Sequence, residues 1–202
     1  MEKIKKFLNK YWIVILIVVI GFVIDRITKI IAINNLKPIG QKEIIRGFFL
    51  FTYTQNTGGG WGMFSGHMWL FYIVTIIAIG VFIYFMKEIN MKEKPLFSIG
   101  LALMFAGCLG NFYDRIFQGY VVDFLDMYIF GYDFPIFNFA DICLTCGAGI
   151  IIIYLLIHMN DSDQPKKEVV NSNNASTTSE NSTEGNLDNK ISTDTKNKEN
   201  KK

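Results

Sequence analysis

Long apolar blocks separated by short polar stretches dominate the first three quarters of the chain. Each block approaches the ~20 residues that a helix needs to cross a hydrocarbon core of ~30 Å. The four prolines fall between or beside the blocks, so they leave the helix interiors unbroken. The pattern predicts an all-α membrane protein with four transmembrane helices, at about residues 11–33, 69–86, 96–115 and 136–158.

The N-terminal sequence MEKIKKFLNK precedes the first apolar block and is similar to the start of a secretory leader. The block is long, however, and no A-x-A-like cleavage site follows it. We therefore expect a first span that is retained.

The loop between the first two spans is unusual in composition. Residues 44–56 are rich in aromatic residues and alternate with a period of two, and the turn Gly58–Gly60 follows. Glycine backbone can approach another chain closely, which suits peptide recognition. We expect a small extracytoplasmic β-rich loop domain at about residues 40–64.

The composition changes at about residue 160. The whole chain is 50% hydrophobic with a mean hydropathy of +0.27, yet residues 160–202 contain no aromatic residue. Such a segment cannot bury enough surface to offset its ordering entropy, so we expect a membrane domain at 1–159 and a disordered tail at 160–202. The seven lysines of the tail nearly balance its eight acids, and we expect no nucleic-acid partner.

The lysines also predict how the chain crosses the membrane. Four lie in the first ten residues, three lie in the linker 85–95, and Lys166 and Lys167 follow the fourth span. Cytoplasmic loops carry the excess of Lys and Arg. Both termini and the linker 85–95 are therefore expected in the cytoplasm, with the other two loops outside.

The first span carries charges where a simple anchor has none. At ~1.5 Å per residue from Tyr11, Asp25 lies about 21 Å deep and Lys29 about 27 Å deep. These residues are four apart, share a helix face and are expected to pair. Arg26 lies about 100° away from that face, and we expect it to reach the outer headgroups as a snorkelling side chain.

Other polar residues are predicted at the same depth. Span three ends in a polar turn, span four begins with one, and the loop between them carries three acids. Convergence of separate stretches on one level indicates a site. The residues are Asn111, Asp114 and Arg115 in span three, Asn138 and Asp141 in span four, and Asp123, Asp126 and Asp133 in the loop.

Elimination favours carboxylate chemistry. The chain has no H-E-x-x-H, no G-x-S-x-G and no phosphate-binding glycine loop. Two carboxylates that share a proton can activate a water without a metal or cofactor. Asp141 is one candidate, and its partner is Asp123, Asp114 or, less favoured, Asp126. Two alternatives remain: an ion transporter that uses the buried charges, and a thiol-redox enzyme that uses Cys143 and Cys146.

Four motifs, in order along the spans, resemble those of bacterial lipoprotein signal peptidase (signal peptidase II). DRITK resembles D-x-x-[ST]-K, and NTGGGWG resembles N-T-G-x-x-[FW]-G. AGCLGNFYDRIFQGYVVDF resembles G-G-x-x-G-N-x-x-D-R…V-V-D-F, and FNFAD resembles F-N-x-A-D. The sequence departs from this pattern at Ala106, Cys108, Gly59 and Gly60, none of which is a catalytic position.

The resemblance implies an aspartic endopeptidase that cuts prolipoproteins just before a diacylglyceryl-modified cysteine, with Asp123 and Asp141 as the catalytic pair. It implies a multi-pass bacterial cytoplasmic-membrane protein that contacts membrane lipids, has its site near the outer face and needs no cofactor. We expect a monomer. The implied supporting residues are Asp25, Lys29, Asn56, Gly58, Gly110, Asn111, Asp114, Arg115, Asn138 and Ala140.

Overall fold

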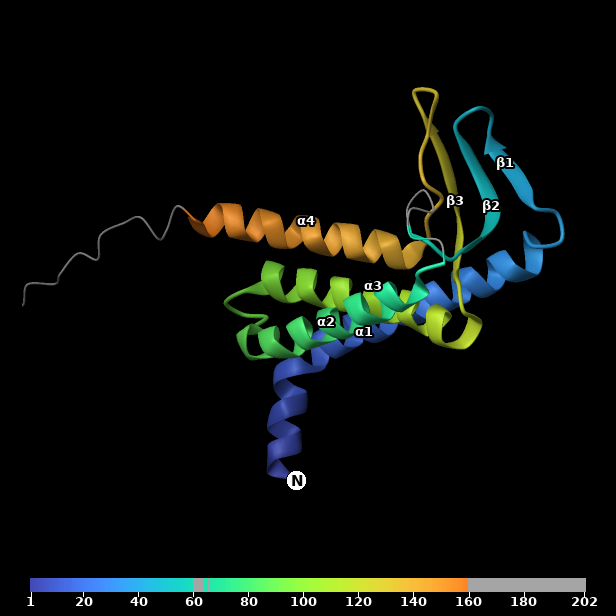
Figure 1. The fold of residues 1–202 in the computed structure, drawn as a ribbon. Helices are drawn as coiled ribbons and strands as arrows, with labels where there is room; N and C mark the ends of the chain where they lie inside the picture. Colours follow the sequence, from blue (N-terminus) through green and yellow to red (C-terminus); the bar gives the residue numbers. More distant parts are fainter. Residues whose placement is uncertain (60–63, 65, 160–202) are drawn as a thin grey trace, which may run out of the picture. The chain divides into compact units, whose positions relative to one another are not determined.

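The computed structural model describes residues 1–59, 64 and 66–159. Long helices and two pairs of strands follow one another along the chain (Figure 1). The elements are α1 (Glu2–Asn35), β1 (Gln41–Ile45), β2 (Phe49–Asn56), α2 (Met68–Phe85), the 3₁₀ turn η2 (Met86–Glu88), α3 (Pro95–Gln118), β3 (Val121–Ile129), β4 (Tyr132–Asp133) and α4 (Phe139–Met159). The tail predicted to be disordered, residues 160–202, lies outside the described residues. So do residues 60–63 and 65, which belong to the glycine loop that begins at Gly58.

Within the described residues, four helices are long and apolar enough to cross a membrane. They overlie the four predicted blocks, although α1 begins nine residues before Tyr11. Most of their apolar side chains are exposed, whereas α3 is the most buried helix. This distribution suits helices that face lipid and pack around α3.

Glycine and alanine allow the other helices to approach α3 closely. A Cβ added at Gly100 would lie 2.8 Å from the carbonyl oxygen of Gly147 on α4, and one added at Gly107 would strike the carbonyl oxygen of Ala140. On the other side, a Cβ at Gly21 of α1 would lie 2.9 Å from Cβ of Ala106. Small residues at such positions are typical of membrane-helix interfaces.

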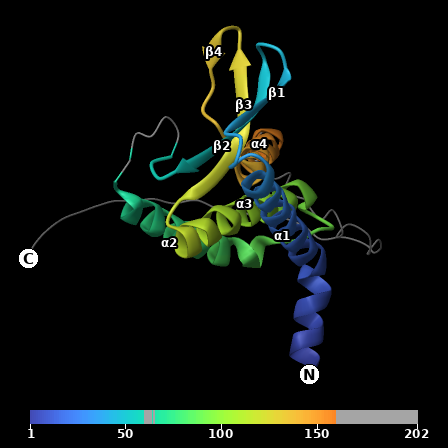
Figure 2. The same cartoon turned by 90° about the vertical axis from the view of Figure 1, so that its right-hand side faces the viewer.

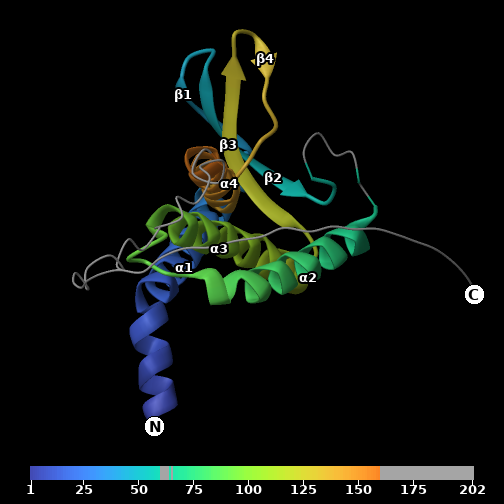
Figure 3. The ribbon, with the colours of Figure 1, turned by 90° about the vertical axis from the view of Figure 1, so that its left-hand side faces the viewer.

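A four-stranded antiparallel sheet lies at one end of the helices, in the order β1-β2-β3-β4 (Figures 2 and 3). β1 and β2 confirm the strands predicted between the first two helices. β3 and β4, which come from the loop between α3 and α4, were not predicted from the sequence. β2 pairs with β3, and so joins segments about 70 residues apart in the chain.

The β2–β3 pairing contains an irregularity that affects where the site lies. The register shifts between Phe51 and Thr54, so that two residues of β2 oppose one residue of β3. Such a bulge changes the direction of nearby side chains. Under this part of the sheet, Val122 and Phe124 pack with Ala32 and Leu36 at the end of α1. This small core attaches the sheet to the helices directly beside Asp123.

Candidate active site

Four charged side chains form a buried ion-pair cluster between α1 and α3. Lys29 Nζ lies 3.2 Å from Asp25 Oδ1 and 2.9 Å from Asp114 Oδ2. Arg26 lies 2.7 Å from Asp25 Oδ2 and 2.6 Å from Asp114 Oδ1. The predicted Asp25–Lys29 pair is confirmed. The prediction that Arg26 reaches the headgroups is wrong, because its guanidinium turns inward to balance two buried carboxylates.

The partner of Asp114 also differs from the simplest expectation. Arg115 is its sequence neighbour, but Asp114 forms its ion pairs with Arg26 and Lys29 of α1. Asp114 additionally accepts hydrogen bonds from the side chain of Gln118 at 2.7 Å and from the backbone N–H of Val122 at 3.2 Å. Both carboxylate oxygens of Asp114 therefore have partners within the protein.

Two asparagines connect this cluster to a second pair of carboxylates. Asn111 accepts from Lys29 Nζ at 2.8 Å and donates its amide to Asp141 Oδ1 at 2.8 Å. Asn138 donates to Asn111 Oδ1 at 3.1 Å and to Asp123 Oδ1 at 2.6 Å. The sequence brings Asn111, Asn138, Asp123 and Asp141 from three elements into one hydrogen-bonded network.

Asn138 and Asp141 also begin helix α4. The N–H of Asp141 donates to Asn138 Oδ1 at 3.2 Å, and the N–H of Asn138 donates to Asp141 Oδ2 at 3.0 Å. This reciprocal pairing is the arrangement of a capping box. The spacing of three residues therefore both starts the helix and fixes the direction of the Asp141 carboxylate.

Asn56, at the end of β2, holds Asp123 from the opposite side. Its amide donates to Asp123 Oδ2 at 2.7 Å. Its side-chain oxygen Oδ1 accepts hydrogen bonds from the backbone N–H groups of Gly58 and Gly59, at 3.0 and 2.7 Å. Gly59 has φ +71°, a left-handed conformation that favours glycine. Asn56 thus fixes the glycine turn and the Asp123 carboxylate together.

Gly110 and Ala140 are small for a steric reason. A Cβ on Gly110 would lie 2.6 Å from Asp25 Oδ2 and 3.2 Å from Cβ of Ala140. Ala140 is itself fully buried, and its backbone N–H donates to Asp25 Oδ1 at 3.1 Å. The two predicted supporting positions therefore leave space for the ion-pair cluster.

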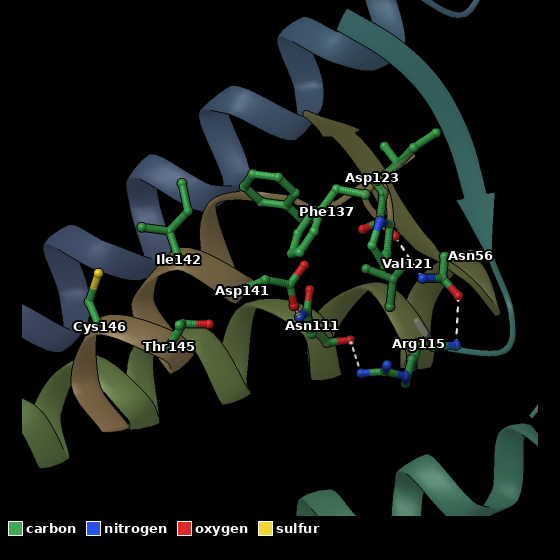
Figure 4. A pocket seen from close by; sticks show the side chains of 14 residues that line it. Asn56, Asn111, Arg115, Val121, Asp123, Phe137, Asp141, Ile142, Thr145 and Cys146 are labelled. Carbon is green, nitrogen blue, oxygen red and sulfur yellow. Dashed lines mark hydrogen bonds between the residues drawn. The ribbon is translucent and has the colours of Figure 1, made fainter. Parts of the chain in front are cut away.

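Asp123 and Asp141 line one cavity of about 530 Å³. Figure 4 shows Asp141 next to Asn111 on the helix side of this cavity, with Asp123 and Asn56 on the strand side. A second cavity of about 430 Å³ extends between α2, α3 and α4 and shares Gly59, Asn111, Arg115 and Asp141 with the first. The remaining lining of the second cavity is mostly apolar, so a polar site borders an apolar groove.

Arg115 lies where the two cavities meet. Its guanidinium stacks over the ring of Phe71 at 4.5 Å, and its Nη1 donates a long 3.4 Å bond to the backbone oxygen of Asn111. The hydroxyl of Tyr72 donates to the Arg115 carbonyl at 2.8 Å. The guanidinium therefore adds positive charge to the cavity wall next to Asp141.

Burial gives Asp123 unusual protonation behaviour. Its side chain is 2% exposed. Burial, and next the negative charge of Asp141, raise the pKa of Asp123 to about 7, although the hydrogen bonds from Asn56 and Asn138 oppose this change. Asp123 therefore exchanges its proton near neutral pH, as expected for one member of an acidic pair.

The other acids of the β3 region lie elsewhere. Asp126 is buried and accepts a 2.6 Å hydrogen bond from the hydroxyl of Thr52. Asp133 is exposed on β4. Neither is among the described residues that line the cavity. Of the C-x-x-C cysteines, Cys143 is buried, Cys146 is exposed, and both are free thiols.

The sequence matches a known family over most of its length. The family described as signal peptidase (SPase) II matches residues 17–157. The chain belongs to the signal peptidase II family. The resemblance inferred from the four motifs is confirmed, and a signal peptidase II is a peptidase of bacterial membranes.

Individual relatives support the same family membership. A lipoprotein signal peptidase of Listeria monocytogenes serotype 4a (strain HCC23) is 43% identical over 148 residues, which are 73% of this chain and 94% of the relative. One from Staphylococcus aureus (strain bovine RF122 / ET3-1) is 46% identical over 156 residues, 77% of this chain and 93% of the relative.

Two solved structures of bacterial membrane enzymes, obtained by the in meso method, share the fold. One, at 2.3 Å resolution, matches with a TM-score of 0.68 and 44% identity over 79% of this chain and 97% of its own. The other, at 1.9 Å resolution, matches with a TM-score of 0.63 and 46% identity over 73% of this chain and 96% of its own.

Among the described residues, one network of ion pairs and hydrogen bonds joins eight of the motif positions: Asp25, Lys29, Asn56, Asn111, Asp114, Asp123, Asn138 and Asp141. The contribution of Arg26 to the ion-pair cluster was not predicted from the sequence. The available signal was a charge imbalance, because Asp25 and Asp114 are two acids at one depth and Lys29 is one cation. Two buried acids beside one buried lysine leave a net negative charge, and this imbalance predicts a second buried cation.

Proposed function

We propose that the chain is an aspartic lipoprotein signal peptidase that cleaves prolipoproteins on the N-terminal side of a diacylglyceryl-modified cysteine. One observation carries the mechanism: Asp123 and Asp141 line the same cavity and are linked through Asn111 and Asn138. The other buried acids at this level are neutralised by ion pairs or lie outside the cavity.

The pair has the properties that an acid–base mechanism requires. Two neighbouring carboxyl groups hold one proton between them over a range of pH, and they titrate as a pair. Because the pKa of Asp123 is raised to about 7, such a singly protonated state is populated near neutral pH. One carboxylate then serves as a base and the other carboxyl as an acid.

The proposed reaction needs no group beyond the two acids and a water. The ionised carboxylate removes a proton from water while the water oxygen attacks the scissile carbonyl, and the protonated carboxyl donates to the carbonyl oxygen. The C–N bond then breaks, and the leaving nitrogen receives a proton from the pair. The products are a signal peptide with a C-terminal carboxylate and a lipoprotein whose modified cysteine has a free amine.

The surroundings of the pair suit a lipid-modified peptide. Arg115 offers hydrogen-bond donors to substrate carbonyl groups beside Asp141. The apolar walls of the second cavity, from Val74 and Phe82 on α2 to Leu101 and Met104 on α3, suit aliphatic substrate groups. With both termini in the cytoplasm, as the lysine distribution predicts, the sheet and this site would lie at the outer face of the membrane.

The test is cleavage of a diacylglyceryl-modified prolipoprotein by the purified full chain, followed by gel shift. Asp123→Asn and Asp141→Asn should each lower kcat by roughly 10²–10⁴-fold, because each removes a proton-transfer group. Asp114→Asn should keep partial activity, since Asp114 supports the site without touching substrate.

Asp126→Asn is the matched control, because it makes the same substitution on β3 three residues from Asp123 and should keep near-normal activity. An inactive Asp114→Asn together with an active Asp123→Asn would refute this pair while leaving a peptidase. Absence of cleavage by folded wild-type protein would refute the function itself.

A further inference from the structure

Each member of the proposed pair follows a residue whose backbone N–H is held by a different buried carboxylate. Asp114 accepts from the N–H of Val122, which precedes Asp123. Asp25 accepts from the N–H of Ala140, which precedes Asp141. The positions of the two site aspartates therefore depend on the positions of two other aspartates, one on α1 and one on α3.

Arg26 joins those two supporting carboxylates. Its Nη1 lies 2.6 Å from Asp114 Oδ1, and its Nη2 lies 2.7 Å from Asp25 Oδ2. Nη2 also lies 3.3 Å from the backbone oxygen of Gly110, and the guanidinium lies over the ring of Tyr113 at 4.6 Å. A guanidinium is a rigid planar fork, so two nitrogens bound to two acids fix the separation of those acids.

Lys29 contacts the same two carboxylates but cannot fix their separation alone. An ammonium is a compact charge on a flexible stem and imposes little geometry on its partners. Its Nζ is also committed to the side chain of Asn111 at 2.8 Å. With Lys29 alone, the cluster would carry one positive charge for two negative charges, and its two acids would repel each other.

We infer that Arg26 is a positioning residue that fixes the separation of Asp123 and Asp141. This inference rests on the proposed function, in which those two residues form the catalytic pair. Arg26 acts through Asp25 and Asp114 and through the backbone bonds that these accept. Its side chain is 15% exposed and its guanidinium is committed to the cluster, so its role is separate from substrate binding.

Charge gives a second readout besides rate. The charged groups that act on Asp123 are Asp141 from α4, Arg115 from α3 and Lys29 from α1, whereas α2 carries no charged residue. Loss of the Arg26 charge leaves the cluster with a net charge of −1. This negative charge would raise the pKa of Asp123. A substitution that keeps the charge of Arg26 and loses only the planar fork would leave that pKa unchanged.

The experiment compares wild type, Arg26→Lys, Arg26→Gln and Arg46→Gln in the full chain. Arg46 lies exposed in the β1–β2 turn, so Arg46→Gln makes the same charge change away from the cluster. Kinetics with the diacylglyceryl-modified prolipoprotein give kcat and KM. Carboxyl ¹³C NMR gives the titration of Asp123 whether or not the protein cleaves.

Arg26→Lys keeps the charge but loses the fork, so kcat should fall about 10-fold with KM within about two-fold and with the Asp123 titration unchanged. Arg26→Gln should lower kcat about 100-fold, the scale of a misplaced catalytic group, and should move the Asp123 titration to higher pH. Arg46→Gln should match wild type in both readouts.

Arg26→Lys with wild-type kcat would overturn the inference, and so would Arg26→Gln with an unmoved Asp123 titration. If Arg26→Gln fails to fold, Arg26→Lys and its kcat decide. If folded wild type does not cleave, the proposed function fails separately, and the NMR titration of Asp123 still tests the connection to Arg26.

Discussion

Replacing Asn56 with alanine removes the hydrogen bond by which β2 holds the Asp123 carboxylate, 2.7 Å from its Oδ2. This bond favours the ionised form and opposes the burial that raises the pKa of Asp123 to about 7. Without it, the pKa of Asp123 should rise further. A substitution at Asn56 therefore tests the protonation behaviour of Asp123 and leaves both site carboxylates in place.

The size of the effect follows from the type of bond. A hydrogen bond to a charged group contributes roughly 1.5–3 kcal/mol, and a change of one pH unit corresponds to about 1.36 kcal/mol. Asn56→Ala should therefore move the titration of Asp123 upward by roughly one to two pH units. It should also lower kcat, because the N–H groups of Gly58 and Gly59 lose their acceptor.

The assay is kcat/KM for prolipoprotein cleavage as a function of pH. The pair must hold one proton to act, so the rate of the wild type should fall as the pH rises through about 7, where Asp123 loses its proton. In Asn56→Ala the fall should begin at higher pH. Gln55→Ala is the matched control, since Gln55 is the exposed neighbour that bonds the hydroxyl of Tyr53.

A lower rate with an unmoved basic limb would refute this reasoning. It would mean that Asn56 acts through the glycine turn alone, and that the group titrating near pH 7 is not Asp123. An equal shift of the basic limb in Gln55→Ala would show that any substitution at the end of β2 shifts the pH profile, so that the hydrogen bond from Asn56 is not the cause.

Two further predictions concern stability, measured by thermal unfolding in detergent. Gly110→Ala should destabilise the fold by about 1–3 kcal/mol, because its Cβ would meet Asp25 Oδ2 at 2.6 Å, whereas Gly149→Ala, with nothing within 4 Å of the added Cβ, should be nearly neutral. Lys29→Met should cost about 3–5 kcal/mol, because it leaves two buried carboxylates with one cation, and Lys37→Met at an exposed position should cost little. Equal effects of Gly110→Ala and Gly149→Ala, or of the two lysine substitutions, would contradict the packing and the ion-pair cluster.

Features that depend on local pattern could be predicted from the sequence. Lengths of apolar residues predicted the four helices, because a hydrocarbon core requires about 20 such residues in a row. The spacing of Asp25 and Lys29 predicted their pairing on one helix face. The spacing of Asn138 and Asp141 placed them on one face at the start of the fourth helix, where they form the capping box. Motif order alone led to the correct family.

Features that depend on contacts between distant segments became visible only in the folded structure. β3 was missed because it pairs with β2, about 70 residues earlier, and its neighbours in sequence carry no turn signal as strong as the glycine loop. Residues alone left Asp123, Asp114 and Asp126 open as partners of Asp141. The fold separates them, because Arg26 and Lys29 neutralise Asp114, Thr52 binds Asp126, and Asp123 shares a cavity with Asp141. Charge partners across helices are set by packing, and a linear sequence does not specify them.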